Sequence, residues 1–373
     1  MFATLLVATV VLSILSLLPL WRHEAWWVRS LDFPRLQLLV ISLFLLFMDS
    51  VFLDLSHPST WGLLVIASLC FAYHAWWIVP YTRLFPVEVK PAISADSQRI
   101  IRIMTANVLT PNRNAMALIE LVRENSPDLL VTLESDAWWQ ARLDALEPDY
   151  PYTIKCPLDN LYGMHVYSRL PLPDSRIDYL VESDIPSIHT LVSLPSGHNI
   201  RVHFLHPAPP SPTESEESSE RDAELVIVAK SVAKTDAPVI VTGDLNDVAW
   251  SETTRLFRKV SGLLDPRVGR GMFNTFHADY WFMRWPLDHL FHSDHFNLSC
   301  MRRLRGFGSD HFALLTELVF EAGRDIQQSG LKADGDDLAW AKVKADEQGV
   351  SKNDVPQPGN AQNRESRIER HLV

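Results

Sequence analysis

The sequence has few cysteines and no excess of positive charge. Its three cysteines, Cys70, Cys156 and Cys300, are far apart and form no C-x-x-C pair, which excludes a dense disulfide framework and the usual zinc motifs. Free thiols suit a reducing compartment. The chain has 34 lysines and arginines against 45 aspartates and glutamates. A broad basic surface for duplex nucleic acid is therefore not expected.

Long apolar segments, in contrast, fill much of the first 80 residues. They cover residues 2–20, 36–53 and 61–80, and each approaches the roughly 20 residues that a helix needs to cross a bilayer. Half of the 12 tryptophans lie at or near their ends, as is typical of the membrane interface. We predict three membrane-spanning helices within residues 1–82. A cleaved signal peptide is the alternative for the first segment, but that segment lacks a basic start.

Loop charges indicate how these helices are oriented. Three arginines lie between the first two segments, the turn around Asp54 has no lysine or arginine, and Arg83 and Lys90 follow the third segment. The positive-inside rule then places the amino terminus outside and the residues after about 82 in the cytoplasm. We predict a multi-pass protein of the cell's inner (plasma) membrane, with residues 83–98 as a linker.

Residues 99–321 have a different pattern, in which short apolar runs alternate with amphipathic stretches and turns. "RIIRIMTANV" and "PDLLVTLE" are typical of strands and "NAMALIELVREN" of a helix. Further strands are predicted at "GMHVYS", "IHTLVSL", "IRVHFLH", "PVIVTGD", "LDHLFHS" and "HFALLTELVF", and a helix at "SSERDAELVIVAKSVAK". This mixture favours an α/β sandwich of mixed sheets. Residues 207–220 are predicted to form a flexible loop, and the polar residues 322–373 a mostly disordered tail.

Polar residues recur at the ends of the predicted strands. "VIVTGDLND" ends a strand with Asp244 and Asn246, which alternation places on the same side. The other members of this set are Asn107, Glu134, His206, Asp288, Asp310 and His311. Each alone has an ordinary explanation as a turn former, a surface carboxylate or a half-buried imidazole. Their recurrence at strand ends favours one shared site.

These residue types suit the hydrolysis of a phosphate ester with a bound metal ion. Mg²⁺ prefers carboxylate and carbonyl oxygens, and Mn²⁺ accepts the same ligands. Glu134, assisted by Asn107 and Asp310, is therefore the predicted metal site. The metal would offset the charge that develops on the phosphoryl oxygens.

The remaining polar residues suit acid–base work on the same phosphate. An Asp288–His311 pair would raise the pKa of the imidazole and keep a cation near the phosphate. Asp244 would orient or deprotonate the attacking water, and Asn246 would donate to a phosphate oxygen.

The order of these motifs resembles a known family. The series "TANVL", "TLES", "YGMHVYSR", "FLHP", "TGDLND", "LDHLF" and "GSDHF" is similar to the endonuclease/exonuclease/phosphatase superfamily of metal-dependent phosphoesterases, related to deoxyribonuclease I. The "HPAPP" turn and the "WSETT" helix start resemble its bacterial membrane-anchored subgroup. The resemblance implies a four-layer α/β sandwich, with two mixed β-sheets flanked by helices, over residues 99–321.

The resemblance also implies roles for the site residues. Glu134 matches the principal metal ligand, with Asn107 beside it, and Asp244 matches the water-activating carboxylate. His206 takes the place of a His or Tyr near the scissile phosphate. The remaining matches are Asn246 to the phosphate-contacting neighbour, Asp288 and His311 to an Asp–His pair, and Asp310 to the carboxylate beside the metal.

We therefore predict a membrane-anchored, Mg²⁺-dependent phosphoric ester hydrolase, with the lipid bilayer as a partner through the N-terminal helices. Its substrate would be a phosphodiester or phosphomonoester in a nucleic acid, a phospholipid headgroup or a small phosphate ester, and the sequence does not choose among them. The alternative is a catalytically inactive binding or scaffold module of the same fold. The presence of all the expected metal and histidine positions argues against this alternative.

Overall fold

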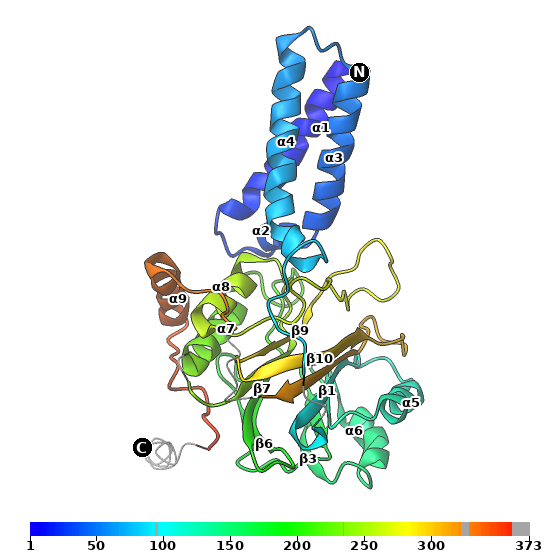
Figure 1. Cartoon of the computed structure of the whole chain (residues 1–373), viewed down its shortest axis with the longest axis vertical. Helices are drawn as coiled ribbons and strands as arrows, with labels where there is room; N and C mark the ends of the chain where they lie inside the picture. Colours follow the sequence, from blue (N-terminus) through cyan, green and yellow to red (C-terminus); the bar gives the residue numbers. More distant parts are fainter. Residues whose placement is uncertain (94–95, 234, 322–327, 360–373) are drawn as a thin grey trace.

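The computed structural model describes a bundle of three long helices and an α/β domain beneath it (Figure 1). The described residues are 1–93, 96–233, 235–321 and 328–359. Two stretches of the predicted tail, 322–327 and 360–373, lie outside the described residues.

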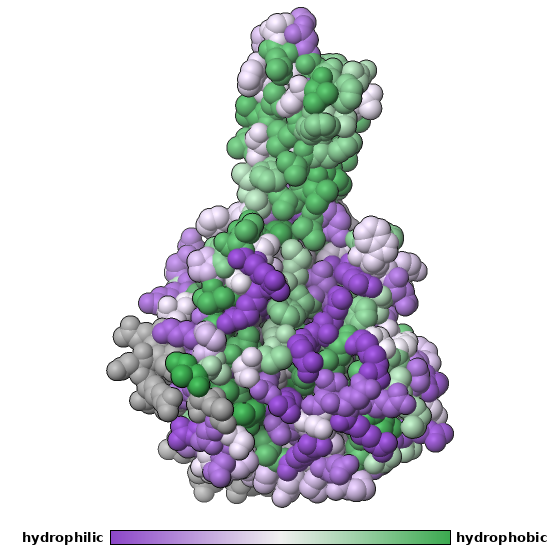
Figure 2. All heavy atoms as spheres, turned by 45° about the vertical axis from the view of Figure 1, so that its right-hand side comes forward, coloured by the Kyte–Doolittle hydropathy of each residue, from purple (hydrophilic) through white to green (hydrophobic). Residues whose placement is uncertain are grey.

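The three long helices have the length and the apolar composition needed to cross a membrane. They are α1 (Phe2–Leu17), α3 (Arg35–Phe52) and α4 (Pro58–Ile78), and they overlap the three predicted segments. Apolar side chains cover the outside of the bundle (Figure 2), and Leu43 is 56% exposed. Polar groups turn inward, where Ser16 Oγ lies 2.9 Å from His74 Nε2. This distribution is opposite to that of a water-soluble helix bundle.

Two β-sheets form the centre of the α/β domain. The six-stranded sheet has the order β10 (Phe296–Arg303), β11 (Leu314–Phe320), β1 (Ile100–Asn107), β2 (Leu129–Leu133), β4 (Met164–Ser168) and β3 (Tyr152–Cys156). The five-stranded sheet has the order β5 (Arg176–Asp178), β6 (Ser187–Ser193), β7 (Asn199–Leu205), β8 (Val239–Asp244) and β9 (Asp288–His292). Both sheets are mixed, because β1 and β2 are parallel, β7 and β8 are parallel, and the other pairs are antiparallel.

The sheets pack face to face and helices cover their outer faces. Val131 of β2 and Phe204 of β7 are fully buried in the core between the sheets. The six-stranded sheet is covered by α5 (Ala115–Asn125) and α6 (Ala137–Leu143), and the five-stranded sheet by α7 (Ser219–Val232) and α8 (Glu252–Ser261). Helix α9 (Gly335–Glu347) packs on α7 and α8. Short 3₁₀ helices lie at Leu18–Leu20, Ser30–Asp32, Val79–Tyr81, Ser97–Arg99 and Asp144–Leu146. The predicted four-layer α/β sandwich is confirmed.

The prediction of a disordered tail over residues 322–373 is wrong for α9. This helix begins with a capping box at Asp334 and packs on α7 through buried Ala341. Lys344 is also buried, and its Nζ lies 2.6 Å from an oxygen of Asp222 in α7. The prediction relied on the polar composition of the whole segment. A helix needs only one narrow apolar face to pack against a domain, and such a face changes the average composition little.

The bundle is joined to the α/β domain by specific contacts. The short helix α2 (Trp26–Arg29) lies between α1 and α3, and the Trp26 N–H donates to Glu216 O at 2.9 Å. Trp250 Nε1 donates to Asp32 O at 2.9 Å, and the Tyr81 hydroxyl donates to Ala249 O at 2.5 Å. The predicted linker also lies along the domain, where Val89 is fully buried. The helices are therefore docked on the domain rather than tethered to it by a free chain.

Candidate active site

Strand order brings the predicted site residues to one end of the sandwich. Because β1 and β2 are parallel, Asn107 and Glu134 lie side by side where these strands end. In the other sheet, Asp244 pairs with Asp288 across β8 and β9. The two sheets meet just before these residues, where the hydroxyls of Thr105 and Thr242 are 3.1 Å apart.

Unusual backbone conformations set the direction of these side chains. Glu134 and Asn246 have φ angles of 57° and 51°, in the left-handed region, at a cost of about 1–2 kcal/mol each for a residue other than glycine. Gly243 has φ 150°, and a Cβ at this position would lie 1.9 Å from Leu205 O. Such strain persists where the surrounding structure enforces it, and it is common at functional sites.

His311 lies between two buried carboxylates. Its Nδ1 is 2.8 Å from Asp288 Oδ2, and its Nε2 is 3.5 Å from Asp244 Oδ2. Burial alone would lower the pKa of His311, but the attraction of Asp288 and Asp244 outweighs it and raises the pKa to about 10. The imidazole is therefore a cation at neutral pH.

This charge state decides what the three residues can do together. Ligand atoms of Asp244, Asp288 and His311 lie within 4.8 Å of one another, a spacing that suits a metal ion. A histidine ligand must be deprotonated, however, and both ring nitrogens of His311 already face carboxylates. The geometry thus favours an ion-pair network that holds a proton over coordination of a metal by His311.

Glu134 has the properties of a metal ligand. Asn107 Nδ2 donates to Glu134 Oε1 at 2.7 Å and to Asp244 Oδ2 at 3.1 Å, so that the amide links the two carboxylates. Burial, with repulsion from Asp244 and Asp310, raises the pKa of Glu134 to about 7. A nearby cation would restore the charged form. The oxygen of Asn107 accepts from the Leu109 N–H at 3.0 Å and keeps a second lone pair for a metal.

A cavity of about 340 Å³ opens onto these groups. Its wall includes five predicted site residues: Glu134, His206, Asn246, Asp310 and His311. Its volume lies in the usual range for small-molecule sites. The structure therefore brings residues from both sheets to one hollow, whereas Asn107, Asp244 and Asp288 are buried behind its wall.

His206 and Asn246 offer hydrogen bonds without charge. Burial, as the largest effect, lowers the pKa of His206 to about 4, so its ring is neutral at pH 7. Its Nδ1 is buried and has no hydrogen-bond partner among the described residues. Asn246 Nδ2 donates to Pro207 O at 2.9 Å, which leaves one amide hydrogen for a ligand.

Several residues of the cavity wall were not predicted from the sequence. The Tyr162 hydroxyl bonds to Glu214, and the Phe276 ring lies 5.0 Å from the His311 ring. Ser30 and Phe33, from the connection between α2 and α3, also line the cavity. Tyr162 stands in the "YGM" motif, which was a usable signal, whereas nothing in the sequence links residues 30–33 to the site.

The four-layer sandwich and a polar site at its strand ends define a class of phosphoesterase-like α/β folds. The model of the Endonuclease/Exonuclease/phosphatase family matches residues 104–311, more than half of the chain. The chain belongs to this family, whose members are hydrolases acting on phosphoesters. Comparison with curated proteins gave no match.

Solved structures of similar fold come from animals and bacteria. A D. rerio TDP2 structure with a single-strand DNA product has 17% identity and a TM-score of 0.50, and it covers 59% of this chain and 98% of its own. The human Nocturnin catalytic domain with bound sulfate has 18% identity and a TM-score of 0.49, with coverages of 60% and 95%. The Beutenbergia cavernae endonuclease/exonuclease/phosphatase has 19% identity and a TM-score of 0.49, with coverages of 60% and 72%. At these identities the likeness concerns the fold alone.

Proposed function

We propose that this protein is a membrane-anchored, metal-dependent phosphoesterase that cleaves a phosphodiester or a phosphomonoester. The observation that carries the proposal is the cationic His311, held between Asp288 and Asp244, beside Glu134 at one cavity. A fixed positive charge and a carboxylate in need of a cation are what phosphoryl transfer requires. Family membership supports the same reaction class.

Glu134, with Asn107 and Asp310, would hold the metal ion. Their carboxylate and amide oxygens fit Mg²⁺, and Mn²⁺ accepts the same set. The raised pKa of Glu134, which reflects burial before repulsion from neighbouring carboxylates, is the structural reason for a cation here. When bound, the metal would neutralise charge on the phosphoryl oxygens.

The other residues would bind and orient the reacting groups. The positive charge of His311 would attract a phosphoryl oxygen, and Asp288 fixes the ring through Nδ1. Asp244, buried next to His311, would accept a hydrogen bond from the attacking water. His206 and Asn246 each have a neutral N–H donor for the phosphate.

The test is hydrolysis of bis(p-nitrophenyl) phosphate by the full chain in detergent micelles, with and without Mg²⁺ or Mn²⁺. We expect metal-dependent release of p-nitrophenol that a double variant, Asp244→Ala with His311→Ala, loses. If the wild-type chain shows no activity above this variant, the inactive scaffold of the same fold becomes the better description.

Among the substrate classes, a phospholipid headgroup has a specific observation in its favour. The loop before β9 (yellow in Figure 1) lies near the base of the helix bundle, where Gln37 Nε2 donates to Phe282 O at 2.9 Å. Its tip is aromatic, and Trp281 is 80% exposed. Exposed aromatic side chains are typical of contact with a membrane interface, and Phe33, at the base of the bundle, lines the cavity.

Nucleic acids and soluble phosphate esters are the competing substrates. The similar TDP2 structure contains single-strand DNA, whereas the net charge of −11 on this chain does not favour a long duplex. Hydrolysis of phospholipid vesicles, single-strand DNA and inositol phosphates by the same preparation separates the three classes. The loop arginines further support a cytoplasmic catalytic domain on the inner membrane, which protease protection in inverted vesicles would test.

A further inference from the structure

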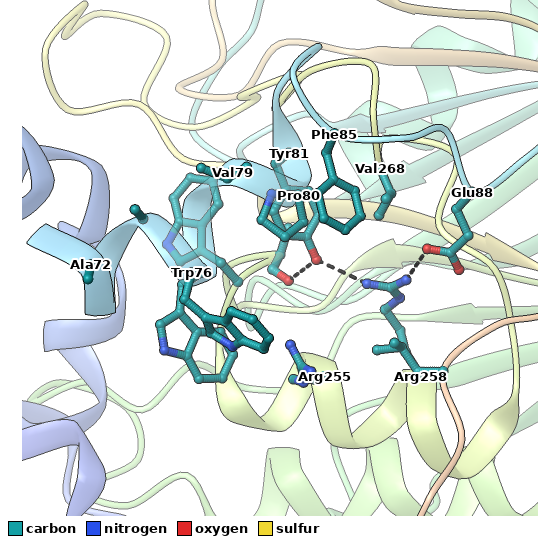
Figure 3. Close-up of a pocket in the computed structure, with 15 residues that line it drawn as sticks. Ala72, Trp76, Val79, Pro80, Tyr81, Phe85, Glu88, Arg255, Arg258 and Val268 are labelled. Carbon is teal, nitrogen blue, oxygen red and sulfur yellow. Dashed lines mark hydrogen bonds and ion pairs between the residues drawn. The ribbon is translucent and has the colours of Figure 1, made fainter.

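A second cavity, of about 520 Å³, lies where α4 meets the α/β domain (Figure 3). One wall is the last two turns of α4, with Ala72, Trp76 and Trp77, and the opposite wall is α8, with Arg255 and Arg258. Among the described residues, none lines both this cavity and the active-site cavity. It is therefore a separate site, and its volume is typical of ligand pockets.

The two arginines of this cavity differ in their partners. Arg258 donates to the Tyr81 hydroxyl at 3.2 Å and forms an ion pair with Glu88. Arg255 lies 5.5 Å from the Trp77 ring centroid, and within the described chain its side chain has no hydrogen bond and no carboxylate partner. The buried Nε of Arg258 also lacks a partner there. The cavity thus has one uncompensated positive charge against a mostly aromatic and aliphatic wall.

The cavity also lies at the level where the third apolar span ends. The span covers Pro58–Tyr81, and Trp76, in its last turn, is 67% exposed. Leu84, just beyond it, is 88% exposed. The apolar surface of the bundle gives way to the mixed surface of the domain at this junction (Figure 2). An interfacial tryptophan beside an arginine is the arrangement expected at the headgroup level of a bilayer.

We propose that this cavity binds an anionic phospholipid, whose phosphate pairs with Arg255 and whose acyl chain lies along Trp76 and Ala72. The guanidinium matches phosphate oxygens in a bidentate geometry, and basic pockets beside membrane helices are suited to anionic headgroups. A soluble phosphate would not cover the apolar wall of the cavity, which would stay in contact with water. The cationic group of a zwitterionic lipid would repel Arg255. The inference rests on the proposed membrane insertion and not on catalysis.

Native mass spectrometry of the full chain tests this proposal directly. The protein is released from detergent micelles doped with equal amounts of phosphatidylglycerol and phosphatidylcholine. We expect the wild-type chain to retain phosphatidylglycerol preferentially. Arg255→Ala should lower the bound phosphatidylglycerol by about tenfold, because a charge-assisted contact is lost. Arg255→Lys keeps the charge but loses the bidentate geometry, so it should lower retention less than Arg255→Ala does.

A matched control is available in α6. Arg142 stacks on Trp138, with its guanidinium 5.3 Å from the ring centroid, and it lines neither cavity. Arg142→Ala removes the same charge and the same type of aromatic contact, and it should leave lipid retention unchanged. Trp76→Ala, at an exposed position, should lower retention even if Arg255→Ala fails to fold.

Three results would overturn the proposal. They are equal retention of both lipids by the wild-type chain, unchanged retention by Arg255→Ala, and full competition by glycerol 3-phosphate at the concentration of the lipid. Cleavage of bis(p-nitrophenyl) phosphate by the same preparations separates this result from the catalytic proposal, since Arg255→Ala should keep the wild-type rate.

Discussion

At the scale of single residues, Glu134 and Asp244 both accept hydrogen bonds from Asn107, but their pKa values are shifted in opposite directions. Burial leaves Glu134 with a raised pKa. Asp244 is also buried, but the attraction of His311 lowers its pKa below the ordinary value. The His311 cation therefore outweighs burial at Asp244 but not at Glu134. This difference is the reason for our proposal that Glu134 binds the metal and Asp244 the attacking water.

Two substitutions should separate these roles. Glu134→Gln keeps the shape of the side chain but removes the charge, so we expect Mn²⁺ affinity to fall at least tenfold, or by about 1.4 kcal/mol. Asp244→Asn should lower turnover while metal affinity stays near that of the wild type. Isothermal titration with Mn²⁺ measures the affinities. Equal affinity in the wild type and Glu134→Gln would remove Glu134 from the ligand set.

The raised pKa of Glu134 also predicts how metal binding depends on pH. A carboxylate ligand must lose its proton to bind, and with a pKa of about 7 Glu134 is mostly protonated at pH 6. Metal affinity should thus fall about tenfold between pH 8 and pH 6. Titrations at the two pH values check this, and Glu134→Gln should flatten the dependence.

The raised pKa of Glu134 also affects the stability of the metal-free protein, which should decrease as pH rises. Because the folded state holds the Glu134 proton more tightly than the unfolded state does, this residue favours folding of the metal-free chain less as pH rises from 4.5 to 7. Metal binding removes that penalty. A bound metal should accordingly stabilise the protein more at pH 8 than at pH 5, by thermal unfolding.

At the scale of elements, the central strands and the edge strand β9 could be predicted, whereas the edge strands β3, β5 and β10 could not. β1, β2 and β8 are apolar runs that end in polar residues, so periodicity and turn chemistry agreed. β10 has exposed residues in its second half and β5 has only three residues, and neither carries a clear pattern. Edge strands are half exposed, and their pairing depends on neighbours that are distant in the chain.

The residues of the candidate site also differ in whether the sequence could predict them. Its strand-end residues could be found because each ends a recognisable strand, although their convergence depended on sheet order. The wall formed by Ser30 and Phe33 depends on how the helix bundle docks. Docking is decided by contacts such as the one between Trp250 and Asp32, which no local pattern shows.

Helix α9 gives a prediction about stability. Lys344 is buried and forms ion pairs with Asp222 at 2.6 Å and Glu24 at 2.7 Å. Lys344→Ala leaves Asp222 with Arg221 as its only cation among the described residues and removes the ion pair of Glu24, so we expect a loss of about 3 kcal/mol in the free energy of unfolding. Lys342→Ala, at an exposed position of the same helix, should change it by less than about 0.5 kcal/mol. Denaturant titrations compare the two, and equal effects would contradict the structural role of Lys344.

At the scale of the whole molecule, the docked helix bundle places the exposed aromatic loop near the end of the apolar helices, where the proposed membrane surface would lie. If the substrate is a membrane lipid, Trp281→Ala should lower the rate on phospholipid vesicles several-fold, because the loop no longer enters the interface. The rate on bis(p-nitrophenyl) phosphate should stay unchanged. Tyr152→Ala is the control, since Tyr152 is an exposed aromatic residue on the edge strand β3. Equal losses on both substrates would contradict a membrane role for the loop.

The contacts of Tyr81 and Trp250 fix the position of the α/β domain relative to the helix bundle. Ala249 and Trp250 follow Asn246 by only a few residues, so the bundle contacts the domain close to the candidate active site. If the helices span a membrane, the active-site cavity stays at a fixed height above the lipid surface. A lipid substrate would then reach the cavity by diffusion within the bilayer. A fragment that starts at residue 94 would lack Ser30 and Phe33, which line the active-site cavity. It would also lack the proposed membrane anchor.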